Sequence, residues 1–207
     1  PEGASPEEYA VEVGVTAIDP WSDPATIHVF HLLRDDLPLL RILLSVSVMR
    51  LGVLDTWLPS EGVQALVDTD STALLERRMV AARAWVEAWR EGRGRPIDAH
   101  VLEASEAVSE SFLAELTAIA AEAGGDARAL LEAIDAKRVK GFRSAKRDEL
   151  ADYLEAEGHL VDGETLTPSE RVARMASVLE QRGLTPDATE LAQLDADLEA
   201  GIVPPAS

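Results

Sequence analysis

The sequence predicts a mainly α-helical protein, a helical bundle around a buried central apolar helix at about residues 37–57. In residues 37–58, fourteen of twenty-two side chains are Leu, Ile, Val, Met or Trp. They fall on every side of a helical wheel, so this helix is expected to be buried all round. Two later stretches, 68–91 and 98–123, repeat apolar residues at helical spacing, which is typical of amphipathic helices that cover such a core.

The N-terminal segment shows a different pattern. Residues 9–18, YAVEVGVTAI, alternate partly between apolar and other side chains, which predicts a short β-strand. A lone strand needs a partner, and that partner is either residues 27–33 or another chain. Residues 27–33, IHVFHLL, fit a strand or a helix, and the pattern leaves both open.

Residues that begin and end helices mark the rest of the chain. Two glycines at 124 and 125 separate an N-terminal helical core with a β segment, residues 1–124, from a smaller C-terminal helical subdomain, residues 125–207. Side chains that accept backbone N–H bonds occupy the expected first positions of the helices. The expected N-caps are Asp36, Asp68 or Asp70, Asp98, Asp126, Ser144, Thr167 and Thr185, and the expected ends include Gly141, Gly158, Gly183 and Gly201.

The formal charge of −19 favours solubility and disfavours nucleic acid and anionic membrane as general partners. The cations are spread unevenly. Residues 137–147, KRVKGFRSAKR, hold six of the nineteen Lys and Arg residues and no acid, whereas the flanking segments are acidic. We call residues 137–147 the basic island.

Composition also excludes several classes of protein. A chain without Cys has no disulfides, thiol catalysis or Cys-ligated metals. Charges at Arg41, Arg50 and Asp55 interrupt the apolar run, so no membrane span is expected. The chain begins without the basic and apolar segments of a signal peptide, so the expected location is cytoplasmic, or within a particle that is assembled inside the cell.

The basic island is the strongest candidate binding site. A basic patch with an aromatic side chain can hold phosphates and stack a base, and its charge also suits an acidic protein partner. The alternative is structural, with these cations offsetting acids within the chain or on a partner subunit. The candidate residues are Lys137, Arg138, Lys140, Phe142, Arg143, Lys146 and Arg147, with Arg171 and Arg174 on a later helix.

The island also has the outline of a helix-turn-helix motif. One helix is expected to end near Lys140, a turn to cover residues 141–144, and a second helix to begin at Ala145. Acids at Asp148 and Glu149 make this second helix a poor reader of DNA, because phosphate would repel them.

A weaker hypothesis concerns metal binding. His28, His31 and Asp35 share one face if their segment is helical, and two imidazoles with a carboxylate can bind zinc or iron. The alternative is two histidines partly buried beside the core, and no cofactor is expected.

The leading functional interpretation is a non-catalytic subunit. The chain lacks nucleotide-binding, serine-hydrolase and zinc-protease motifs. Charge islands of opposite sign suit subunit docking, because they set register and suppress wrong contacts. We therefore expect a helical protein–protein interaction or structural subunit of a larger assembly, such as a virion-like or scaffold component, with a protein partner or self-association. The alternative is a helix-turn-helix-like regulator that binds nucleic acid through the basic island.

Overall fold

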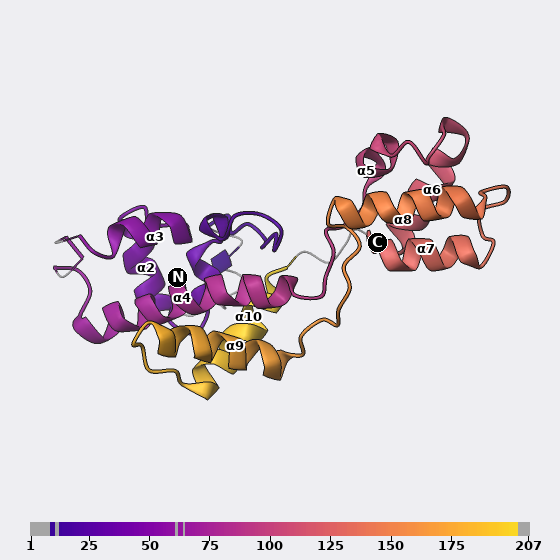
Figure 1. The fold of residues 1–207 in the computed structure, drawn as a ribbon. Helices are drawn as coiled ribbons and strands as arrows, with labels where there is room; N and C mark the ends of the chain where they lie inside the picture. Colours follow the sequence, from indigo (N-terminus) through magenta and orange to yellow (C-terminus); the bar gives the residue numbers. More distant parts are fainter. Residues whose placement is uncertain (1–8, 11–12, 61, 64, 203–207) are drawn as a thin grey trace. The chain divides into compact units, whose positions relative to one another are not determined.

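The computed structural model describes residues 9–10, 13–60, 62–63 and 65–202, and its regular elements are helices (Figure 1). The predicted mainly α class is confirmed. The predicted N-terminal strand is not, because the described part of the chain holds only two isolated β-bridges, Ile18 with Ile202 and His28 with Arg50. Tyr9 is helical and Val13 lies in a turn, while residues 11–12 of the predicted strand fall outside the described residues.

The chain forms two compact units, and one is inserted into the other. In the described residues, unit 1 combines 9–89 with 166–202, and unit 2 comprises 90–165. Each unit has its own cluster of buried apolar residues. This division differs from the expected break between residues 124 and 125, because unit 1 is assembled from both ends of the chain.

Unit 1 is organised around one long helix, α4. This helix spans Thr69–Arg90 and buries nine residues, more than any other helix of the unit. The other elements of unit 1 are η1 Pro24–Thr26, η2 Val29–Leu32, α2 Leu37–Ser45, α3 Leu51–Trp57, α9 Pro168–Gln181 and α10 Ala188–Ala200.

Side-chain bonds attach α4 to neighbours on two sides. Arg83 on α4 pairs with Asp55 on α3, their Nη2 and Oδ2 atoms 3.1 Å apart. Trp85, also on α4, donates its indole N–H to Asp195 on α10 over 2.9 Å. Figure 1 accordingly shows α4 running between the α2–α3 pair and the α9–α10 pair. The helix predicted over 68–91 is confirmed, but as the centre of the unit rather than as its cover.

The expected central helix at about residues 37–57 is wrong as a single element. It is broken into α2 and α3 at Ser47, which adopts a left-handed φ of 63°. It is also not buried all round, since Met49 is 42% exposed and Val53 is 47% exposed. The run covers one side of α4 and turns its other side to solvent.

Hydrogen bonds explain this break. The N–H groups of Ser47 and Val48 return to the carbonyls of Leu44 and Leu43, a Schellman-type end to α2. The backbone that follows α2 forms hydrogen bonds with residues 27–29: the Met49 carbonyl accepts from the Val29 N–H, and the Leu51 N–H donates to the Ile27 carbonyl. Those backbone groups are therefore unavailable to a continuous helix.

Unit 2 is a four-helix insertion. Leu102, Leu116, Leu130 and Leu150 are fully buried in its core. The helix predicted over 98–123 is two helices, because Ser105 takes an extended conformation after the first. The elements are α5 Ala99–Ala104, α6 Glu110–Glu122, α7 Ala127–Asp135 and α8 Ser144–Ala156.

The two ends of the insertion run side by side. The Arg95 N–H donates to the Gly158 carbonyl over 3.0 Å. A Cβ at Gly92 would lie 2.2 Å from the Glu164 carbonyl oxygen, and one at Gly94 would lie 1.9 Å from that of His159. Only glycine allows this close backbone approach, so these two residues permit the closure of unit 2.

Local signals placed most helix starts correctly. The caps predicted at Asp36, Asp98, Asp126 and Thr167 each accept the expected backbone N–H, and Thr167 forms a full capping box with Glu170. Asp68, one of two options, caps α4 by accepting from the Ser71 N–H. Two caps are wrong: Asp187 rather than Thr185 caps α10, and α8 has Arg143 rather than Ser144 at its N-cap. None of the described helices combines the length and apolarity that a membrane crossing requires.

Candidate interaction surface

The basic island lies on the segment that joins α7 to α8 in unit 2. Lys137 and Lys140 follow the end of α7, Arg143 is the N-cap of α8, and Lys146 and Arg147 lie in its first turns. The six cations are thus presented by two helix ends and the loop between them.

Three of the six cations are used within the chain. Arg138 pairs with Glu122 on α6 over 2.7 Å. Arg147 makes a two-pronged contact with Asp135, with nitrogen–oxygen distances of 3.0 and 2.8 Å, and Lys146 pairs with Glu149 over 2.5 Å. These paired cations offset neighbouring acids, as the structural alternative predicted for the whole island. Such exposed pairs stabilise by only about 0–1 kcal/mol each.

The other three cations make no such pair among the described residues. Lys137, Lys140 and Arg143 are exposed and form no ion pair with any described residue. We call these three the loop cations. The net charge of the chain is −19, so the loop cations form a local region of positive charge on an otherwise acidic protein.

The backbone of this loop is fixed from beneath. Val139 is 3% exposed and belongs to the core of unit 2. The Phe142 ring meets Phe112 edge to face, with centroids 5.2 Å apart and an interplanar angle of 88°. Lys137 takes a left-handed φ of 60°, and its N–H donates to the Ile134 carbonyl as part of a Schellman-type end to α7. The loop cations therefore project from a held backbone.

The helix-turn-helix outline differs from the observed geometry. α7 ends at Asp135 rather than near Lys140, and residues 136–143 separate it from α8. The turn of a compact helix-turn-helix motif has about three to four residues, fewer than this connection. Phe142 is half-buried against its neighbour, so its ring is engaged in packing rather than presented for stacking on a base.

Arg171 and Arg174 do not extend the basic island, because α9 belongs to unit 1. Arg171 is 3% exposed and contacts Asp195 through two bonds of 2.7 and 3.1 Å. It also bonds Glu199 and donates to the Leu166 carbonyl. Arg171 is therefore a buried cation that is held within unit 1, unlike the exposed cations of the basic island. Arg174 is exposed.

Each of the candidate metal residues makes other hydrogen bonds. The Asp35 carboxylate receives two hydrogen bonds from Arg78, of 2.5 and 2.8 Å. His28 caps η2 by accepting from the Phe30 N–H through Nδ1, and His31 Nε2 lies 2.8 Å from the Thr16 carbonyl, to which it donates. Across the residues that the structure describes, no three His, Asp or Glu side chains gather as metal ligands.

Burial controls the charge of both histidines. His28 is 2% exposed, and burial, with smaller effects from His31 and Arg50, lowers the pKa of His28 to about 4. Burial also lowers the pKa of His31, against its hydrogen bond to Thr16. Both side chains are therefore neutral at pH 7.

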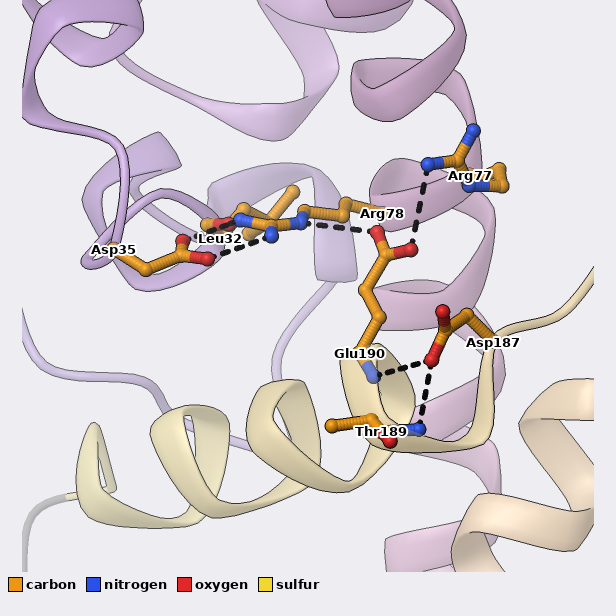
Figure 2. Close-up of polar contacts among 7 residues, drawn as sticks. All are labelled: Leu32, Asp35, Arg77, Arg78, Asp187, Thr189 and Glu190. Carbon is orange, nitrogen blue, oxygen red and sulfur yellow. Dashed lines mark hydrogen bonds and ion pairs between the residues drawn. The ribbon is translucent and has the colours of Figure 1, made fainter.

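A further ion-pair network was not foreseen from the sequence. Figure 2 shows Arg78 on α4 reaching Asp35 on one side and Glu190 on α10 on the other, with its third contact at the Leu32 carbonyl. Arg77 joins the same glutamate over 3.3 Å. The pKa of Asp35 is lowered mainly by its hydrogen bonds from Arg78. The network ties three separate elements of unit 1 together, so its role is structural.

The chain matches no protein-family description, no curated protein and no solved structure.

Proposed function

We propose that this chain is a non-catalytic protein-interaction or structural subunit of a larger assembly, in which unit 2 is the docking unit. One observation carries the proposal: an insertion with its own core presents three exposed cations that pair with no described residue, in a chain of net charge −19. Charge segregation of this kind steers association and fixes register between subunits.

Binding of nucleic acid through the basic island has less support. Half of the island cations are already paired with acids from α6, α7 and α8. The Phe142 ring packs on Phe112. A duplex placed here would also meet the carboxylates of these pairs, which opposes the electrostatic attraction on which such binding depends.

The test is isolation of the full chain from the cells that produce it, with light scattering and mass spectrometry of what accompanies it. We expect a stoichiometric complex, with itself or another protein, whose mass exceeds the 22.3 kDa of one chain. A monodisperse 22.3 kDa species with nothing bound contradicts the proposal. Recovery with bound nucleic acid and no protein supports the alternative instead.

A matched pair of variants separates docking from general charge. Lys140→Glu/Arg143→Glu reverses two loop cations, and Arg41→Glu/Arg182→Glu makes the same change in net charge at exposed positions of unit 1. We expect only the first variant to lose the complex. Equal loss in both would show that net charge, not unit 2, controls assembly.

A further inference from the structure

We propose that the loop cations bind a short acidic segment of the protein partner, one that supplies Asp or Glu carboxylates. This inference rests on the proposed function and makes it specific. It assigns the recognition to Lys137, Lys140 and Arg143, and it assigns the other three island cations to the fold.

The chemistry of the loop cations matches carboxylates. Arg143 carries a planar guanidinium, which can hold one carboxylate through two parallel N–H···O bonds. Lys137 and Lys140 carry compact ammonium groups, each with three rotatable donors, and so can donate to carboxylates that approach from a range of directions. Together they fit one oriented contact and two adaptable ones on an extended acidic chain.

The fixed backbone lowers the cost of binding. Val139 is buried beneath the loop, and the edge-to-face contact of Phe142 with Phe112 holds its other end. Only the long side chains of the loop cations need to become ordered when a partner binds. A site whose backbone is already in place loses less conformational entropy on association.

The flanking acids restrict the size of the partner segment. Asp135 ends α7 and Glu149 lies on α8, on either side of the loop in the chain, and Glu122 pairs with Arg138 within the loop. A long polyanion would have to pass these carboxylates, whereas a short segment can stay on the loop cations. Duplex-binding proteins neutralise roughly six to ten phosphates, about twice or more what three free cations can offer. The arrangement therefore favours a short acidic peptide over a nucleic acid.

The experiment uses the full chain and fluorescein-labelled hexaglutamate, with binding followed by fluorescence anisotropy at about 20 mM NaCl and again at about 150 mM. We expect saturable binding that weakens as salt is added. Lys140→Gln/Arg143→Gln should weaken it about fivefold or more, because each exposed pair contributes up to about 1 kcal/mol. Arg41→Gln/Arg182→Gln removes the same charge from unit 1 and should leave it unchanged.

Three results would overturn the inference: no binding of hexaglutamate at low salt, equal weakening in the control variant, or tighter binding of an oligothymidylate of equal charge. Far-UV circular dichroism of both variants checks that they remain folded. The failure of this inference is distinct from that of the proposed function. If the chain co-purifies with a protein partner but does not bind hexaglutamate, it docks through another surface. If it co-purifies with no partner, the proposed function itself is refuted.

Discussion

Replacing Arg171 with Met is expected to destabilise unit 1 far more than any surface change on the same helix. Arg171 and Asp195 are 3% and 4% exposed and share two hydrogen bonds. In Arg171→Met, the bond from the Trp85 indole N–H is the one that Asp195 keeps among the described residues, so a carboxylate is left buried without a cation. Removing one partner of a buried pair costs about 3–5 kcal/mol, much of it the desolvation of the remaining charge.

A second substitution tests that reasoning. Adding Asp195→Asn to Arg171→Met removes the stranded charge and keeps an oxygen that can accept from Trp85. The double variant is therefore expected to be only about 1–2 kcal/mol less stable than the parent chain, because it lacks an unpaired charge. The single variant would thus be rescued by a further substitution in its own core.

Urea unfolding followed by tryptophan fluorescence is the assay, because all four tryptophans lie in unit 1, at positions 21, 57, 85 and 89. Arg182→Met is the control, since Arg182 is exposed just beyond α9. It should change the free energy of unfolding by less than about 0.5 kcal/mol. A double variant no more stable than Arg171→Met would refute the stranded-charge explanation.

Three other substitutions test separate parts of the structure. Lys137→Gly should stabilise unit 2 by about 0.5–1 kcal/mol in urea unfolding followed by circular dichroism, because glycine relieves the left-handed φ of 60°; a loss of stability would contradict the assigned backbone. Gly94→Ala should destabilise unit 2 by about 1–3 kcal/mol in the same assay, since its Cβ would meet the His159 carbonyl oxygen. Gly62→Ala should have little effect, because among the described residues its Cβ would meet only the Ser60 hydroxyl, at an ordinary contact distance of 4.0 Å. The pKa of His28, lowered to about 4, lies below its unfolded value of 6.5. Neutral His28 therefore makes its full contribution to the free energy of unfolding above pH 6.5, and this contribution falls as the pH drops towards 4. His28→Asn should therefore remove about 2 kcal/mol of the loss measured between about pH 7.5 and pH 5, and an unchanged pH profile would show that His28 is not the group responsible.

Local chemistry predicted the helices whose signals lie within a few residues. Asp68 precedes an apolar stripe at helical spacing and begins α4 as expected. The Thr167 side chain accepts the backbone N–H of Glu170, and the Glu170 side chain accepts the backbone N–H of Thr167. The capping box of α9 could therefore be recognised from four residues alone. These elements depend on contacts between near neighbours in the chain.

The features that could not be predicted depend on distant partners. The apolar run around residues 37–57 breaks because Met49 and Leu51 bond to backbone at residues 27–29, which a helical wheel does not represent. Arg78 pairs with residues 43 and 112 positions away, and no local pattern indicates either one. The insertion of unit 2 likewise becomes visible only when both ends of the chain meet in one core.

The candidate site was predicted in part for the same reason. Its density of cations is evident from composition, so residues 137–147 could be selected directly. Which cations remain free depends on Glu122 from another helix and Asp135 at the end of α7. The half-buried position of Phe142 depends on Phe112, thirty residues earlier in the chain.

The central claim is that unit 2 is an insertion with a core of its own, and urea unfolding with two probes tests it most directly. Tryptophan fluorescence reports on unit 1 alone, because residues 90–165 contain no Trp, whereas far-UV circular dichroism reports on the helices of both units. We expect the two curves to differ, with a transition in circular dichroism that fluorescence does not follow. Coincident single transitions with one midpoint and one slope would contradict the claim, since they would show that the two units unfold as one.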